Sequence, residues 1–334
     1  MKHRLVSRFF DAHTAFEDPV TVVILCSLVL ILAITPVLIG LLERFGFTPA
    51  ALRPELMKRY RSWLILTPLI VTPILLGPGF TILAIGVLSL LCNREFSRAT
   101  GLFREKLISA LVAIGIVAIT LASLDHWYDL FVAISPLTIG IIAMMAILRD
   151  QPQGYIQRVA LGVFGFVLFG LCLGHLGYFA NDRNYRALLM MIFLSVELND
   201  VFAFIVGKTI GKQKLIPNTS PNKTTGGAIG ALILTTLLVF LVGRTVFAGT
   251  VLASPLHLIT MGILISVTGQ FGDLMLSSIK RDLGIKDMDQ TIPGHGGLLD
   301  RFDSILLAGP IMFHYIGYFN GIGLDQTTRV LTGS

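Results

Sequence analysis

Residues 18–44, DPVTVVILCSLVLILAITPVLIGLLER, form an apolar run bounded by charged residues. Its length matches the roughly 20 apolar residues that a helix needs to cross the hydrocarbon core of a bilayer. The whole chain has the same character, because 54% of its 334 residues are hydrophobic and only 14% are charged. A soluble domain carries about 25% charged residues. The sequence therefore predicts an all-α, polytopic integral membrane protein.

Further apolar runs follow the first one, and they give about ten expected transmembrane helices in all. We expect these helices to be centred near residues 31, 69, 86, 116, 139, 170, 197, 237, 266 and 313. The second and third are short and meet at LLGPGF, residues 75–80, where two glycines and a proline predict a tight turn. We expect the first span to be retained, because no pattern of a cleaved signal peptide surrounds it.

The basic residues orient the spans. Cytoplasmic loops of membrane proteins are enriched in Lys and Arg. With the N-terminus outside, five connectors share the inner side, and together they hold 19 of the 26 Lys and Arg residues. These connectors are residues 43–61, 94–106, 149–158, 207–224 and 277–303. We therefore expect both termini outside and a polar site that faces the cytoplasm, although Lys2, Arg4 and Arg8 run against this orientation.

The distribution of charge argues against a nucleic-acid partner, and the cysteine content argues against a disulfide framework or a zinc site. The net charge is +6, but the basic residues lie in short connectors between spans, so membrane topology and anionic substrates explain them and we expect no nucleic-acid partner. Cys26, Cys92 and Cys172 are scattered through the apolar runs. We expect them to be small packing residues rather than a disulfide framework or a zinc site.

Polar residues become denser from about residue 195 onward. We therefore expect residues 1–190 to be an N-terminal transmembrane scaffold and residues 191–334 to be a C-terminal catalytic half, within one membrane unit.

The first polar constellation is VELNDVFAFIVGKTIGKQKLIPNTSPNKTTGGAIGA, residues 196–231. Glu197 and Asp200 lie three apart in an apolar segment and share a helix face. Each charge there costs about 2.5–3.5 kcal/mol on insertion scales, so it needs a polar partner, a metal or water. The alternative is a helix-end cluster near the headgroups.

The same constellation continues into a basic, glycine-containing loop. Lysine charge, hydroxyl groups and the N–H groups at a helix start suit an anionic phosphate. The spacing is not that of a Walker A loop. The candidate phosphate-binding residues of this loop are Lys212, Ser220, Lys223 and Thr224.

The second constellation is TGQFGDLMLSSIKRDLGIKDMDQTIPGHGGLLDRFDS, residues 268–304. Carboxylates alternate here with Lys and Arg, beginning at Asp273 at the end of an apolar run. Mg²⁺ prefers carboxylate oxygens and shares its remaining coordination with substrate phosphates and water. The pattern therefore predicts a site for metal and polyphosphate together. The alternative is a set of solvated ion pairs.

This stretch resembles the signature of the phosphatidate cytidylyltransferase family, the CDP-diacylglycerol synthases. The resemblance rests on Ser277, Lys280, Arg281, Lys286, Asp287, Pro293, His295, Gly296, Gly297, Asp300, Arg301 and Asp303. An upstream region is also similar to that family, through Asp200, Ala203, Gly207, Lys208, Gly211, Lys212, Ser220, Pro221, Lys223 and Thr224. Together these matches cover roughly residues 195–305.

The resemblance implies an enzyme that converts CTP and phosphatidate into CDP-diacylglycerol and pyrophosphate in a bacterial inner membrane. It implies that Asp273 and Asp300 hold Mg²⁺ or another divalent cation, with a second cation left open. Asp200, Asp287 and Asp303 would be further acidic contacts. The phosphates would be neutralised by Lys223, Lys280, Arg281, Lys286 and Arg301. His295 would donate a hydrogen bond, relay a proton or serve the structure. A homodimer is left open.

Two positions depart from the family pattern. Gly226 stands where the family usually has Glu or Gln, and Asp289 replaces a small residue. The alternatives are a CTP-dependent enzyme that acts on another lipid phosphate, an inactive scaffold, and an ion-coupled transporter that uses Glu197 and Asp200.

Overall fold

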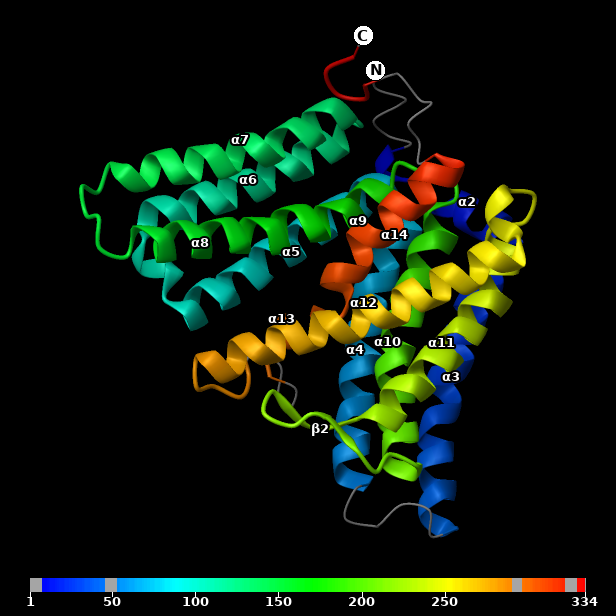
Figure 1. Cartoon of the computed structure of the whole chain (residues 1–334). Coiled ribbons are helices and arrows are strands. Elements are labelled where there is room, and N and C mark those ends of the chain that lie inside the picture. Colours follow the sequence, from blue (N-terminus) through cyan, green and yellow to red (C-terminus); the bar gives the residue numbers. More distant parts are fainter. Residues whose placement is uncertain (1–7, 46–52, 290–295, 322–328, 334) are drawn as a thin grey trace.

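The computed structural model describes residues 8–45, 53–289, 296–321 and 329–333, and these are mostly helical (Figure 1). The principal helices are α2 (Ala12–Glu17), α3 (Pro19–Arg44), α4 (Arg53–Leu76), α5 (Pro78–Thr100), α6 (Lys106–Leu124), α7 (Tyr128–Ile147), α8 (Tyr155–Gly165), α9 (Leu173–Phe179), α10 (Tyr185–Thr209), α11 (Thr225–Val246), α12 (Pro255–Asp282), α13 (Leu299–Phe302) and α14 (Ile305–Asn320). Two short 3₁₀ helices are η2 (Leu102–Arg104) and η4 (Val251–Ala253), and a π-helical segment, η3 (Phe166–Cys172), connects α8 to α9. The all-α expectation is confirmed, apart from one hairpin of two short strands.

Eight helices in the described part are long and apolar enough to cross a membrane. They are α3, α5, α6, α7, the continuous run Tyr155–Phe179 formed by α8, η3 and α9, and α10, α11 and α12. The protein is therefore an integral membrane protein. The other two expected spans correspond to α4, which has charged residues along its first turns, and α14, which has only 16 residues.

The second and third spans are longer than the sequence predicts. α4 has 24 residues and begins at Arg53, inside the expected connector 43–61, and α5 has 23 residues. The expectation of short spans was wrong, because Lys, Arg and Glu are good helix formers and extend each helix beyond its apolar run. The expected tight turn is confirmed, since only Gly77 separates the two helices and Pro78 begins the second.

The helices form two groups in Figure 1, with α5 to α9 in one and α3, α4, α10 and α11 in the other. α12 packs against α11 and α14, and α14 packs against α9, so these two helices join the groups. Phe313 of α14 contacts Tyr178 and Phe179 of α9 edge-to-face. The expected boundary between scaffold and catalytic half, at residues 190 and 191, falls inside α10.

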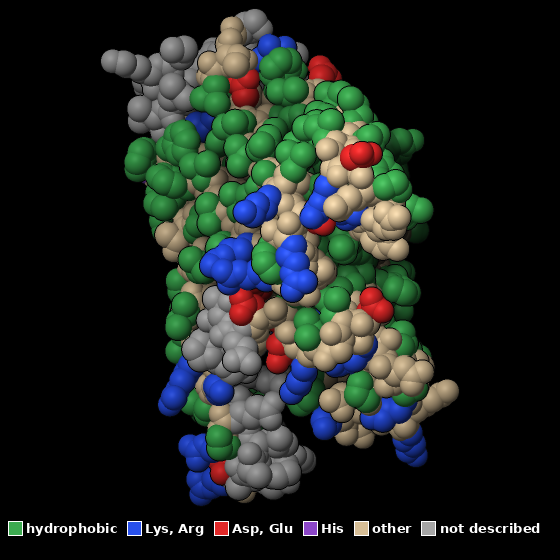
Figure 2. Space-filling view, turned by 90° about the vertical axis from the view of Figure 1, so that its left-hand side faces the viewer, with side chains coloured by type: hydrophobic (Ala, Val, Ile, Leu, Met, Phe, Trp, Pro, Cys, Tyr) green, Lys and Arg blue, Asp and Glu red, His purple; other side chains and the backbone are tan. Residues whose placement is uncertain are grey.

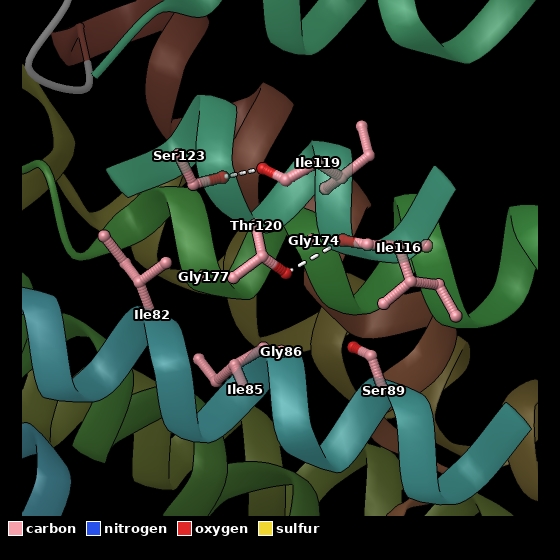
Figure 3. Close-up of a pocket in the computed structure, with 11 residues that line it drawn as sticks. Ile82, Ile85, Gly86, Ser89, Ile116, Ile119, Thr120, Ser123, Gly174 and Gly177 are labelled. Carbon is pink, nitrogen blue, oxygen red and sulfur yellow. Dashed lines mark hydrogen bonds between the residues drawn. The ribbon is translucent and has the colours of Figure 1, made fainter. Parts of the chain in front are cut away.

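A small cavity lies between α5, α6 and the η3–α9 segment (Figure 3). It leaves about 10 Å³ for the centre of a water molecule, which is room for about one. The Thr120 and Ser123 hydroxyls at its edge donate to the carbonyls of Ile116 and Ile119 in their own helix. The cavity is a packing feature of the scaffold and lies among none of the predicted site residues.

Most of the predicted site residues lie at one end of the molecule. In Figure 1 the hairpin and the end of α12 lie at the lower side, whereas α2 lies at the top. Figure 2 shows Lys and Arg side chains over the middle and lower part of one face, below a surface that is mostly hydrophobic. The charged end and the apolar body thus separate as expected for a protein that spans a membrane.

Candidate active site

Four segments meet at the charged end of the fold. They are the second half of α10, the hairpin, the last third of α12 and the junction between α13 and α14. The hairpin consists of β1 (Lys214–Ile216) and β2 (Ser220–Thr224), which pair antiparallel. The two polar constellations of the sequence therefore lie together in space.

One face of α12 carries three of the polar side chains. Asp273, Ser277 and Lys280 are four and three residues apart, so they project from the same side of the helix. The Ser277 hydroxyl donates to Oδ1 of Asp273 at 3.2 Å. This face presents a carboxylate and an ammonium to the other segments.

The hairpin brings a second lysine to this face. Lys223 Nζ lies 2.5 Å from Oδ2 of Asp273, and both side chains are about four-fifths buried. The next residue, Thr224, is buried and its hydroxyl oxygen accepts the N–H of Gly227, which caps α11. The Arg281 side chain donates to the carbonyl of Thr219 at 3.2 Å. The hairpin is therefore fixed to both α11 and α12.

Two of the predicted acids form ion pairs, Asp273 and Asp300, and the side chain of Asp300 is the more deeply buried. Its Oδ1 accepts from Lys280 Nζ at 2.7 Å, and the two side chains are 3% and 10% exposed. Its Oδ2 accepts the backbone N–H groups of Met288 and Gly297, each at 2.9 Å. These charge-assisted bonds compensate for burying the carboxylate.

Asp200 and Asp303 approach each other through Ser304. The Ser304 hydroxyl lies 3.0 Å from Oδ2 of Asp200 and 3.3 Å from Oδ1 of Asp303, and the Ser304 N–H donates to Oδ1 of Asp303 at 2.8 Å. α12 touches this junction closely, because a Cβ on Gly272 would lie 2.5 Å from the Asp303 carbonyl oxygen. Burial raises the pKa of Asp303 well above its ordinary value, and the charges of Asp273 and Asp200 raise it further.

Whether the site suits a divalent cation depends on how these carboxylates are arranged. Asp200, Asp273 and Asp303 repel one another in a buried setting, and a divalent cation would relieve that repulsion. Among the described residues, however, no group of three or more His, Cys, Asp or Glu side chains is arranged to hold a metal ion. The arrangement fits a cation that takes one or two carboxylates from the protein and the rest of its ligands from phosphates and water, as Mg²⁺ does.

The remaining predicted site residues surround this centre or lie outside the description. Lys212 and Lys286 are exposed, and Asp287 lies against Gly296. Ser220 begins β2, and the charges of Lys280 and Arg301 both oppose the raised pKa of Asp303. His295 lies outside the described residues, so its predicted role stays a prediction.

The sequence did not single out Glu95, which comes from the scaffold. This α5 residue is 5% exposed, and its Oε1 and Oε2 accept the N–H groups of Leu298 and Leu299 at 2.9 and 2.8 Å. A glutamate near the end of a span is unremarkable in a sequence, so no local pattern indicated this contact. The charged centre thus draws on both parts of the chain.

Asn199 is a second residue without an assigned role. It is fully buried, and its Oδ1 accepts the hydroxyls of Thr235 on α11 and Ser266 on α12 at 3.0 and 2.6 Å. It therefore ties α10 and α12, which carry Asp200 and Asp273, to α11.

The two departures from the expected pattern lie at the edge of the site. Gly226 faces Gly211, and a Cβ at position 226 would lie 3.2 Å from the Cα of Gly211. The Asp289 backbone lies close to Gly297, since its nitrogen would be 3.1 Å from a Cβ on that glycine.

Comparisons with known proteins place the chain among cytidylyltransferases. The sequence model described as "Cytidylyltransferase family" matches residues 57–319, which includes every segment of the site. The phosphatidate cytidylyltransferase of Staphylococcus haemolyticus is 32% identical over 252 residues, covering 74% of this chain and 94% of that protein. The phosphatidate cytidylyltransferase of Bacillus subtilis is 32% identical over 228 residues, covering 64% of this chain and 81% of that protein.

A third relative has no assigned activity. The uncharacterized protein YnbB of Escherichia coli K12 is 31% identical over 197 residues, and the match spans 57% of this chain and 65% of YnbB. The family match covers well over half of the chain and contains the paired lysines and aspartates described above. The chain therefore belongs to the cytidylyltransferase family.

Proposed function

We propose that the protein transfers the cytidylyl group of CTP to phosphatidate, giving CDP-diacylglycerol and pyrophosphate for phospholipid synthesis. The match to the cytidylyltransferase family over residues 57–319 carries this proposal. The relatives named phosphatidate cytidylyltransferase support the choice of lipid substrate. The cluster of lysines and carboxylates at the end of apolar helices suits a lipid that stays in the bilayer and a nucleotide that comes from water.

In the proposed reaction, an oxygen of the phosphatidate phosphate attacks the α-phosphorus of CTP. A new P–O–P bond forms, the bond from the α-phosphorus to the bridging oxygen breaks, and pyrophosphate leaves with that electron pair. The attacking oxygen is already anionic near neutral pH, so no strong general base is needed. The protein's task is to hold two polyanions together and to stabilise the charge of the leaving group.

The lysines of the two ion pairs have a direct role in this scheme. Lys223 and Lys280 neutralise Asp273 and Asp300 in the structure. We propose that they contact the phosphates when the substrates bind, with Arg281, Lys286 and Arg301 completing the positive surroundings. The serine and lysines of the hairpin region, Ser220 and Lys212, would contact the nucleotide.

Asp273 and Asp300 would hold a divalent cation, with Asp200, Asp287 and Asp303 as further acidic contacts. Such a cation supplies charge neutralisation at the transferring phosphoryl group when it is bound. The protein's own groups fix the two carboxylates through Ser277 on one side and the backbone of Met288 and Gly297 on the other.

We further propose that the site faces the cytoplasm of a bacterial inner membrane, with both termini outside. The excess of Lys and Arg in the connectors on the expected inner side, among them residues 207–224 and 277–303, supports this orientation. A homodimer is compatible with the proposal.

The test uses purified protein with phosphatidate, Mg²⁺ and CTP labelled at either the α or the γ phosphate. Label from α-labelled CTP should enter the lipid, and label from γ-labelled CTP should leave as pyrophosphate. Transfer of γ label alone would replace the proposal by a lipid kinase. Transfer of α label to a different lipid phosphate but not to phosphatidate would keep the chemistry and change the substrate.

A further inference from the structure

Glu95 joins the scaffold to the charged centre through bonds to two backbone N–H groups. Its two carboxylate oxygens accept the N–H groups of Leu298 and Leu299, which are 203 and 204 residues away in the sequence. The side chain is 5% exposed, so the carboxylate has left water and depends on such bonds. Bonds from N–H groups to an ionised carboxylate are about twice as strong as neutral ones.

The segment that Glu95 holds is the one that leads into Asp300. Gly297 lies directly on the glutamate, because a Cβ at this position would be 2.4 Å from Oε2. The N–H of Gly297 donates to Oδ2 of Asp300, and the next two N–H groups donate to Glu95. Three consecutive N–H groups are therefore divided between two buried carboxylates.

This division has a consequence for Asp300. Its Oδ1 is fixed by Lys280, and its Oδ2 accepts the N–H of Met288 and that of Gly297. The second of these N–H groups belongs to backbone that Glu95 holds in place. Without the glutamate, the turn from Gly297 to Leu299 would lose two of its bonds to the rest of the protein. The position of the Asp300 carboxylate would then be less well defined.

We propose that Glu95 is a positioning residue for the reaction, which sets the place of Asp300 by holding the Gly297–Leu299 backbone. This inference rests on the proposed function, in which Asp300 holds the divalent cation. Glu95 itself contacts neither the substrates nor the cation in this scheme. Groups that orient a metal ligand typically contribute about 10–100-fold to metal affinity or activity.

The variants are Glu95→Gln, which keeps the shape but removes the charge and one acceptor, and Glu95→Asp, which keeps the charge. Glu105→Gln is the matched control. Glu105 lies shortly after α5, the helix that carries Glu95, and its side chain pairs with Arg149. The readouts are the Mg²⁺ dependence of the rate and hydrogen exchange of the peptide that contains Gly297–Leu299, both in the full-length protein.

We expect Glu95→Gln to need about 10-fold or more Mg²⁺ for half-maximal rate, with faster exchange confined to the Gly297–Leu299 peptide. Glu95→Asp should recover part of the Mg²⁺ affinity, and Glu105→Gln should behave like the unmodified protein.

Unchanged Mg²⁺ dependence in Glu95→Gln would overturn the proposal, whether the rate falls or not. Faster exchange throughout the protein would also overturn it, since that result assigns Glu95 to general stability. If the unmodified protein has no activity with CTP and phosphatidate, the proposed function fails, and the exchange measurement still tests the contact between Glu95 and the Gly297–Leu299 backbone.

Discussion

Lys223 Nζ lies 2.5 Å from the carboxylate of Asp273 and so attaches the hairpin to α12. The two residues are 50 positions apart in the sequence and come from its two separate polar constellations. Both side chains are largely buried, at 19% and 22% exposed. The pair is thus the point at which a lysine predicted to bind phosphate meets an acid predicted to bind metal.

Loss of either member of this pair should remove most of the activity. Asp273→Asn and Lys223→Met should each lower kcat/KM with CTP by about 100-fold or more, because preorganised charge is the main catalytic device here. The double variant should be little worse than the single ones, since residues that act as a unit are not additive. Asp282→Asn, an exposed acid of the same helix, is the control. A double variant whose losses simply add would show that the two residues act independently.

The pair of Lys280 and Asp300 should also contribute to stability. Lys280→Met leaves a carboxylate that is 3% exposed without its cation, and breaking such a buried pair costs about 3–5 kcal/mol. We expect a clear drop in the thermal unfolding temperature of the detergent-solubilised protein. Lys286→Met, at an exposed position, should unfold like the unmodified protein. Equal unfolding temperatures for the two variants would contradict a buried ion pair.

The buried carboxylate of Asp303, when ionised and without metal, should lower the stability of the folded protein. Its pKa in the folded protein is raised above the ordinary value of 3.8, mainly by burial. The folded protein therefore binds a proton that the unfolded chain has lost, so stability falls as the pH rises from about 3.8 towards the raised pKa. Asp303→Asn removes this loss.

In a chelator at neutral pH, Asp303→Asn should therefore unfold at a higher temperature than the unmodified protein, and the difference should shrink as the pH is lowered. The same variant should lose activity, as is common where a site is built from mutually repelling charges. A stability difference that grows as the pH is lowered would contradict the sign of the shift.

The orientation in the membrane can be read from two cysteine substitutions. Asn218→Cys lies in the exposed turn of the hairpin, and Ala248→Cys lies in the exposed connector between α11 and α12. The background should carry Cys26→Ser, because Cys26 is exposed whereas Cys92 and Cys172 are buried.

An impermeant maleimide should label position 248 in intact spheroplasts and position 218 only in inside-out vesicles. This follows from the excess of Lys and Arg in the connectors around the hairpin. Labelling of position 218 from outside would reverse the proposed orientation.

Removal of divalent cations should abolish product formation, and Mg²⁺ should restore it. Among the described residues no group of three or more His, Cys, Asp or Glu side chains is arranged to hold a metal ion. The substrate phosphates would therefore supply further ligands, and the rate should rise with Mg²⁺ and with CTP in a linked manner. Full activity in excess chelator would contradict the assignment of Asp273 and Asp300 as ligands.

The sequence by itself determined the class of fold and the family, and it supplied the predicted site residues. Runs such as residues 18–44 had to be helical spans, because backbone groups in a bilayer must be hydrogen-bonded within their own segment. The spacing of the Lys, Arg and Asp residues in 268–304 was sufficient to indicate the family. Helix lengths were less predictable, as α4 shows, because charged residues extend a helix as readily as they end a span.

Only the tertiary structure decided which charges meet. The pair of Lys223 and Asp273, and the contact of Glu95 with Leu298 and Leu299, join residues that are about 50 and 200 positions apart. Sequence spacing fixes neighbours along one helix face, such as Asp273, Ser277 and Lys280. Contacts between helices depend on how their surfaces pack, here with Gly272 allowing α12 to touch the Asp303 backbone.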